Sequence, residues 1–147
     1  MKIIDTRTYV DMLRELTESG KEVSMTVAGS SMAPFLVHHR DTIYFNKPDG
    51  PLKKGDMVFY QRVDGQYVMH RIYKVKDKEF YMVGDAQTEI EGPLCDKQIF
   101  ARITKIRRKG KLIQPRDFWW WFFAKVWIRL VPIRPLIIKM YRLCCRS

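Results

Sequence analysis

The serines of the segment Gly29-Ser30-Ser31-Met32-Ala33-Pro34 are the first residues of the chain whose types and spacing could do chemistry. The segment reads as a glycine-containing bend after a β run, where a serine hydroxyl can be presented outward with its own backbone N–H beside it. Acyl transfer needs this arrangement, because the hydroxyl attacks a carbonyl and an N–H group binds the oxyanion that forms. A serine hydroxyl is weakly nucleophilic near neutral pH, so a general base must lie within hydrogen-bond reach of it.

Three histidines are available as that base, His38, His39 and His70. His38 and His39 are adjacent, so their side chains face opposite ways in an extended chain, and no cysteine or acid spacing near them supports a metal site. We interpret both as surface residues. His70 shares one face of a predicted strand with Val68 and Ile72, and a partly buried face suits the neutral imidazole that a general base requires.

Four short motifs occur in a fixed order along the chain. They are Gly-x-Ser-Met-x-Pro at 29–34, Lys-Gly-Asp at 54–56, His-Arg-Ile at 70–72 and Gly-Asp at 84–85. Each motif alone is a weak signal, but four in this order on a β scaffold are a strong one. Over roughly residues 22–107 the chain resembles signal peptidase I, a serine peptidase of the S24/S26 type. Because His leads the 70–72 motif, the resemblance is closest to the Ser-His branch found in archaea and the endoplasmic reticulum.

The resemblance implies that Ser31 attacks the scissile carbonyl and that His70 takes the serine proton and later passes it to the leaving amine. It also implies that the Ser31 backbone N–H helps to bind the oxyanion. Oxyanion and substrate binding are expected from the residues around the nucleophile, namely Gly29, Ser30, Met32 and Pro34. No metal and no cofactor is expected.

A third group should orient the imidazole, and Asp85 and Glu91 are the two candidates. Asp85 belongs to the Gly-Asp motif and is placed slightly ahead. Glu91 falls where the Ser-His branch tends to place an aspartate, and Ala86 stands where the family usually has asparagine. The resemblance further implies that Arg71 pairs with an acid of the Gly-Asp region.

Asp56 belongs to a structural turn. Like Arg71, it is expected to support the site and not to act in catalysis.

The elements that must position these residues are mainly β-strands. Residues 5–20 carry apolar side chains three and four apart and end at Gly20, which predicts a short amphipathic helix. From Glu22 onward, short runs rich in Val, Ile, Tyr and Phe alternate with Gly, Pro and Asp turns, a pattern typical of a compact β domain. The predicted strands are residues 22–28, 42–46, 57–62, 66–76, 79–83 and 98–107.

The chain has a formal charge of +11, from 27 Lys and Arg against 16 Asp and Glu. The run 102–116 is basic and has no acid, and the aromatic run Phe118-Trp119-Trp120-Trp121-Phe122-Phe123 follows it. Aromatic anchors beside cations are typical of an interfacial helix, so residues 102–141 are expected to contact a membrane surface, and no nucleic acid is expected.

The chain, 147 residues long, has room for one domain with a modest appendage. We expect an N-terminal amphipathic helix over 1–21, a β-rich peptidase domain over 22–115 and a basic-aromatic, membrane-associating tail over 116–147. The fold expected is that of the signal peptidase and repressor-cleavage β domain.

The expected function is cleavage of an extended segment of a precursor polypeptide. Two alternatives remain open, a catalytically degenerate peptidase fold that binds peptide or membrane, and a self-cleaving regulator. Residues 1–23 contain no apolar stretch suited to a signal peptide or a spanning helix. The basic-aromatic tail predicts a membrane-associated protein, and the lack of such a stretch in residues 1–23 allows an active site on the cytoplasmic face.

Overall fold

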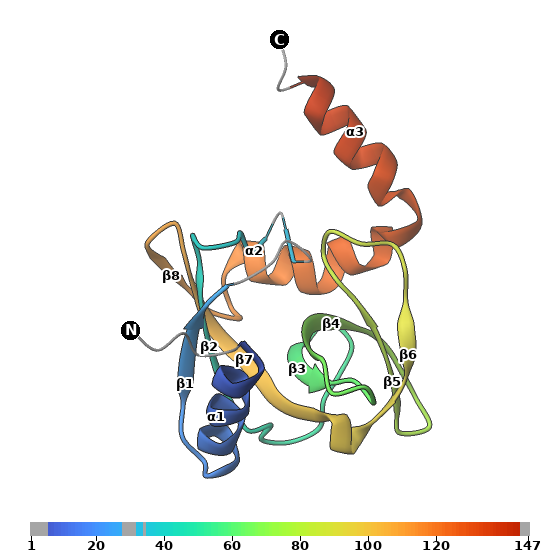
Figure 1. Ribbon diagram of the computed structural model, residues 1–147. Coiled ribbons are helices and arrows are strands. Elements are labelled where there is room, and N and C mark those ends of the chain that lie inside the picture. Colours follow the sequence, from blue (N-terminus) through green and yellow to red (C-terminus); the bar gives the residue numbers. More distant parts are fainter. Residues whose placement is uncertain (1–5, 28–31, 34, 145–147) are drawn as a thin grey trace.

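The computed structural model describes residues 6–27, 32–33 and 35–144, which form one antiparallel sheet with a helix before it and a helical segment after it (Figure 1). The strands lie in the order β1-β2-β7-β3-β4-β5-β6, and β8 pairs with β7. The expected mainly β fold is confirmed. The strand bounds are β1 Val23–Thr26, β2 Thr42–Asn46, β3 Met57–Gln61, β4 Tyr67–Lys76, β5 Glu79–Val83, β6 Glu91–Cys95, β7 Ile99–Arg108 and β8 Lys111–Ile113.

Six of these strands coincide with the predicted runs, and β6 and β8 do not. β6 has the sequence EGPLC, in which Pro93 breaks the strand pattern, and it is tolerated because β6 is the last strand in the order of the sheet. A short 3-10 turn, η1 Asp96–Gln98, joins it to β7. β8 has only three residues and follows Gly110 in a tight hairpin with β7.

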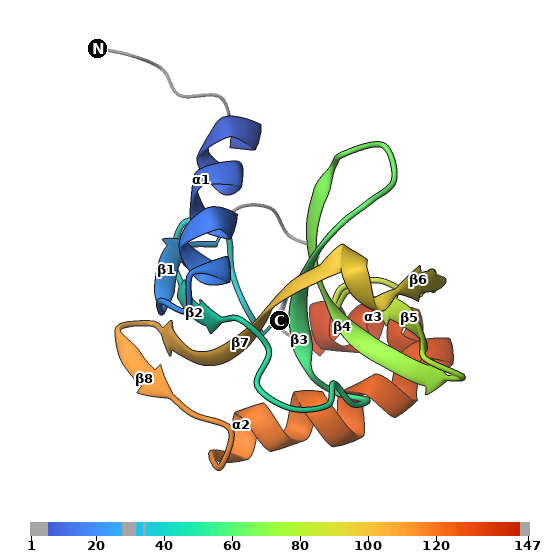
Figure 2. The ribbon, with the colours of Figure 1, turned by 90° about the horizontal axis from the view of Figure 1, so that it is seen from below.

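The N-terminal helix α1, Thr6–Glu18, packs on β7 and β1. Val10 and Leu13 are the buried positions of its apolar face, and Tyr9 and Leu16 are more than one-third exposed. Gly20 ends the helix with φ of 90°, a conformation that favours glycine. Figure 2 shows α1 at one edge of the molecule and the helical residues 118–133 along the opposite edge, with strands between them.

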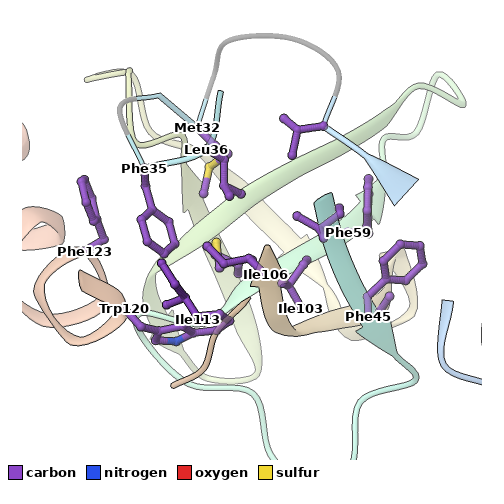
Figure 3. Packing of buried hydrophobic residues seen from close by; sticks show 14 of the residues in the cluster. Met32, Phe35, Leu36, Phe45, Phe59, Ile103, Ile106, Ile113, Trp120 and Phe123 are labelled. Atoms are coloured by element: carbon purple, nitrogen blue, oxygen red, sulfur yellow. The ribbon is translucent and has the colours of Figure 1, made fainter. Parts of the chain in front are cut away.

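The sheet is buried on both faces at its centre. In β3, Met57 and Phe59 belong to the larger apolar cluster, whereas Val58 and Tyr60 belong to a second cluster on the other face. Successive strand residues point to opposite faces, so a fully buried strand supplies both cores. The larger cluster includes Met32, Phe35, Leu36, Phe45, Ile103, Ile106, Trp120 and Phe123 (Figure 3).

The C-terminal helical segment consists of four consecutive pieces. They are α2 Phe118–Trp121, the π-helical turn η2 Phe122–Val126, the 3-10 segment η3 Trp127–Ile133 and α3 Arg134–Cys144. Side chains three and four apart along it are buried against the β-strands, namely Trp120, Phe123, Ala124, Trp127, Ile128, Val131 and Arg134.

The boundary expected at residue 116 therefore does not separate a tail from the β domain. Trp120, Phe123 and Trp127 lie in the same apolar cluster as Phe45 and Ile106 of the sheet. The sequence predicts a membrane-contacting role for the aromatic run, but helical periodicity buries two of its six side chains, Trp120 and Phe123, in the core. Only α3 extends away from the strands (Figure 1).

Two buried side chains fasten this segment to the turn at residues 84–87. Trp127 donates its indole N–H to the carbonyl oxygen of Asp85 at 2.7 Å. Arg134 donates to the carbonyl oxygens of Gly84 at 2.8 Å and Gln87 at 2.9 Å. Each of these bonds satisfies a backbone group that folding removes from water, so the segment and the turn form one unit.

Within the part of the chain that the structure describes, no helix combines the length and the apolar character needed to cross a bilayer.

We expect Trp127→Phe to lower the free energy of unfolding by about 1–3 kcal/mol, because the substitution leaves the Asp85 carbonyl without its donor. Urea denaturation of the full chain measures this change. Trp121→Phe is the matched control, since Trp121 is half-exposed, and it should change the free energy by less than about 0.5 kcal/mol. Equal effects of the two substitutions would contradict the fastening role of Trp127.

Candidate active site

Arg71, in the motif at 70–72, contacts the motifs at 54–56 and 84–85. Its Nε and Nη2 donate to the two carboxylate oxygens of Asp85, each at 2.9 Å, and its Nη1 donates to the carbonyl of Gly55, also at 2.9 Å. Both side chains of the Arg71–Asp85 pair are fully buried. The guanidinium carbon lies 5.5 Å from the ring centroid of Phe35, the residue that follows the serine motif. Arg71 thus has the supporting contacts that the resemblance implies.

The turn at 54–56 must approach the helical segment closely. Gly55 has φ of 96°, and a Cβ added there would lie 2.5 Å from the carbonyl oxygen of Ala124 in η2. The Asp56 carboxylate accepts a hydrogen bond from the backbone N–H of Lys53 at 3.1 Å and lies 3.7 Å from Arg102. These contacts agree with a structural role for Asp56.

His70 lies on the face of β4 opposite to Arg71 and is 4% exposed. Its Nδ1 is 3.1 Å from the hydroxyl oxygen of Tyr60, and that hydroxyl is 3.1 Å from Oε2 of Glu91. The register of β3 and β4 pairs Val58 with His70, so Tyr60 is a diagonal neighbour of His70 on the same face of the sheet. Glu91 at the start of β6 completes the chain of contacts.

Arg62 holds the Glu91 carboxylate with three hydrogen bonds. Its Nε donates to both oxygens at 2.9 and 3.0 Å, and its Nη2 donates to Oε1 at 2.6 Å. Burial raises the pKa of Glu91, but the hydrogen bonds and charge of Arg62 outweigh burial and bring the pKa below its usual value. Glu91 is therefore an anion at neutral pH and can only accept hydrogen bonds.

The negative charge of Glu91 determines which atoms of the His70–Tyr60–Glu91 network carry protons. Because the Glu91 carboxylate cannot donate, the Tyr60 hydroxyl donates to it, and the Tyr60 oxygen then accepts from Nδ1–H of His70. Burial, with the charge of Glu91, raises the pKa of Tyr60 well above its usual value, so the hydroxyl keeps its proton. The neutral imidazole then carries its lone pair on Nε2, the nitrogen that a general base uses.

Burial lowers the pKa of His70 to about 4, against the opposing effect of the Glu91 charge. The imidazole is therefore neutral at physiological pH. Among the described contacts, only Nδ1 of the ring is hydrogen-bonded. The arrangement can accept a proton at Nε2 and can stabilise the resulting imidazolium through the Tyr60–Glu91 chain.

His70 lines an open groove of about 1120 Å³, which we call the His70 groove. Residues 86–92 line it together with residues of α3, and Arg62 also contributes. The imidazole is thus at the edge of a surface groove.

Four of the predicted site residues, Gly29, Ser30, Ser31 and Pro34, lie outside the described residues. Met32 is described, and its side chain is buried at 1% exposure in the larger apolar cluster (Figure 3). Met32 is predicted to take part in oxyanion or substrate binding, and its thioether, which lies in the core, is not exposed to a substrate.

The contacts favour Glu91 over Asp85 as the acid coupled to His70. The sequence slightly favours Asp85 over Glu91 as the acid that orients the imidazole. In the structure, both carboxylate oxygens of Asp85 accept hydrogen bonds from Arg71 on the other face of β4. His38 and His39 stack on each other at 3.5 Å and are exposed, as expected of surface residues.

Tyr60 and Arg62 were not singled out from the sequence. A signal for them was present, because a hairpin joining the runs 57–62 and 66–76 puts Tyr60 and Arg62 on the same face as His70. Within the described ranges, no group of three or more His, Cys, Asp or Glu side chains is placed to hold a metal ion.

Comparison with known families gives one match. Residues 2–103 match the family model described as Peptidase S24-like. The match ends before β8 and the C-terminal helical segment. No curated protein and no solved structure matches the chain.

We expect the folded protein to lose stability through His70 as the pH is lowered. The pKa of His70 is about 4 in the folded chain and 6.5 when unperturbed, so between these values the unfolded state binds a proton that the folded state does not. From pH 7 to pH 5 this one group should lower the free energy of unfolding by about 2 kcal/mol. Urea denaturation at both pH values, with an NMR titration of the His70 ring, measures the effect.

His70→Gln should lose less stability over the same interval, whereas His38→Gln should behave as the unmodified chain does. An imidazole of His70 that titrates near pH 6.5 would contradict the buried, neutral base.

Proposed function

Because the chain belongs to the Peptidase S24-like family, we propose that it is a serine endopeptidase of the signal peptidase I type that uses a Ser-His mechanism. Ser31 is the nucleophile and His70 is its general base. The substrate is an extended segment of a precursor polypeptide. The proposal needs no cofactor.

The observation that carries the proposal is the hydrogen-bond chain from His70 through Tyr60 to Glu91. A histidine in a strand is usually a structural residue, and a buried structural histidine needs a partner for its polar atoms but no groove. Here the ring is neutral, its Nδ1 is engaged by Tyr60, and it lines the His70 groove. These are the properties of an oriented base.

In the proposed reaction, Nε2 of His70 takes the proton of the Ser31 hydroxyl while the serine oxygen attacks the scissile carbonyl. Tyr60 and Glu91 are positioning residues, because they fix the tautomer of the ring and stabilise its cation. The imidazolium then gives its proton to the leaving amine, and the acyl group remains on the Ser31 oxygen as an ester. A water molecule next gives a proton to Nε2 of His70 and attacks this ester carbonyl; the bond to the Ser31 oxygen breaks, the serine regains the proton, and the acyl group leaves as a carboxylic acid. The Ser31 backbone N–H helps to bind the oxyanion.

Two described residues support the closeness of the serine motif to His70. Ala33, inside the motif, and Ala86, next to the Gly-Asp motif, line one surface groove. Ala86 also lines the His70 groove. Ala33 and His70 therefore border two grooves that share Ala86.

We expect Ser31→Ala and His70→Ala to lower turnover by at least about 10³-fold without unfolding the chain, since each removes one half of a unit that transfers a single proton. The measurement is cleavage of a precursor-peptide library by the full chain, read by mass spectrometry. A fluorophosphonate probe that labels the protein at Ser31, and does not label Ser31→Ala, reports the nucleophile directly.

Tyr60→Phe removes only the hydroxyl and should lower turnover by about tenfold with little change in substrate binding. Tyr44→Phe on β2 is the matched control. Self-cleavage of the chain, with no cleavage in trans, would favour the regulator alternative. Peptide binding that survives Ser31→Ala, with no cleavage by the unmodified chain, would favour the degenerate fold.

We also propose that the protein works at an anionic membrane surface. In support, Phe118 and Trp121 are half or more exposed, and the chain just before them carries the exposed cations Lys109, Lys111 and Arg116. Exposed aromatic side chains next to cations suit the headgroup region of a bilayer.

Vesicles containing anionic phospholipid should therefore sediment the full chain, and neutral vesicles should not. The double variant Phe118→Ala/Trp121→Ala should weaken this binding several-fold, and raised salt should weaken it further. Val63→Ala serves as the control, because Val63 is 98% exposed in the β3–β4 turn. Binding that is the same for all three chains would contradict this membrane surface.

A further inference from the structure

A second groove lies between the helical pieces of the C-terminal segment, and we call it the aromatic groove. Its volume is about 530 Å³, which is within the range of small-ligand sites. One wall comes from α2, η2 and η3, and the other from α3. The lining is mostly apolar and includes Trp119, Phe122, Trp127, Ile137, Ile138 and Tyr141.

The aromatic groove is continuous with the His70 groove. Ala86, Ile138 and Arg142 line both. Ala33 of the serine motif lines the aromatic groove as well. A polypeptide bound beside His70 would therefore pass Ala86 and continue between α3 and the aromatic side chains.

Charge distinguishes the α3 side of this path. Lys139 and Arg142 are exposed and line the His70 groove, and residues 118–144 contain no acid. On the opposite side, the charge of Glu91 is paired with Arg62, and the exposed Glu89 also lines the groove. An acidic side chain in the bound polypeptide would find its complement at the junction of the two grooves.

We propose that the C-terminal segment selects the substrate, and that the aromatic groove binds a run of bulky apolar side chains next to an acidic residue in the precursor polypeptide. The inference rests on the proposed function, because it assumes that the polypeptide bound beside His70 is the substrate. It goes beyond that function in naming the sequence class. It also assigns this selection to residues beyond 103, where the family match ends.

Both walls are held in place before any peptide binds. Trp127 and Arg134 fasten the segment to the turn at 84–87, and Ile137 and Ile138 pack against the larger apolar cluster. A preorganised groove loses less conformational entropy on binding than a mobile one. Each bulky apolar side chain removed from water then contributes about tenfold or more in affinity.

The test uses the full chain with Ser31→Ala, so that binding is measured without cleavage. Fluorescence anisotropy compares two labelled synthetic peptides, one with a run of leucines beside an aspartate and one with serines in place of the leucines. We expect the leucine peptide to bind tenfold or more tightly than the serine peptide. Adding Ile137→Glu should abolish this preference, and Ile137→Ala should reduce it several-fold.

Met140→Glu is the matched control, because Met140 is on the same helix, is 58% exposed and lines neither groove. Circular dichroism shows whether each variant keeps its fold. Arg142→Gln should reduce the preference for aspartate over asparagine beside the leucines.

Equal affinity for the two peptides would overturn the inference. So would an equal loss of the preference for the leucine peptide in Ile137→Glu and Met140→Glu. Failure of the proposed function is distinguishable from this result. If the groove binds the leucine peptide but the unmodified chain cleaves nothing, the function fails and the groove remains. If the unmodified chain cleaves both peptides equally well, the function remains and the groove inference fails.

Discussion

The guanidinium of Arg71 is a charge with no access to water, and the arrangement of the site depends on how that charge is satisfied. An unpaired buried charge costs several kcal/mol, so the folded chain must bring a carboxylate and further acceptors to it. Asp85 supplies two oxygens and Gly55 supplies a carbonyl. The turns at 54–56 and 84–85 therefore cannot move away from β4 without exposing or orphaning the ion pair. Residues far apart in the sequence are held at fixed positions by this one requirement.

The position of Arg71 in the strand also explains why the proposed general base lies on the opposite face of β4. Adjacent strand residues face opposite ways, so fixing Arg71 inside the core presents His70 to the opposite face. Two ion pairs thus flank one strand. The Arg71–Asp85 pair is fully buried, whereas the Arg62–Glu91 pair lies at the edge of the His70 groove. Glu91 accepts the hydrogen bond of the Tyr60 hydroxyl, so the Tyr60 oxygen is left to accept from Nδ1–H of His70. An arginine–carboxylate pair thus occurs on each face of β4, and the two pairs differ in exposure.

Local patterns predicted much of this arrangement. Alternation in the run 66–76 placed His70 with Val68 and Ile72, and the sheet keeps that face. Local alternation does not predict which acid, Asp85 or Glu91, contacts His70. That depends on which face of β4 each acid lies against in the folded chain. Tyr60 was missed for a related reason. A tyrosine in a Val-Phe-Tyr run reads as core filling, and its hydroxyl acquires a role only through the register of β3 with β4.

The aromatic run shows the limit of composition as evidence most clearly. Six consecutive aromatics beside a basic run resemble a membrane anchor, but a helix distributes successive residues around its axis. Trp120 and Phe123 consequently enter the core, Trp119 and Phe122 line the aromatic groove, and Phe118 and Trp121 remain exposed. The core positions bind the helical segment to the sheet, and Trp127 and Arg134 then hold the turn that carries Asp85. The Arg71–Asp85 pair is therefore secured partly by residues outside the matched region 2–103, so the β-strands and the C-terminal segment stabilise each other.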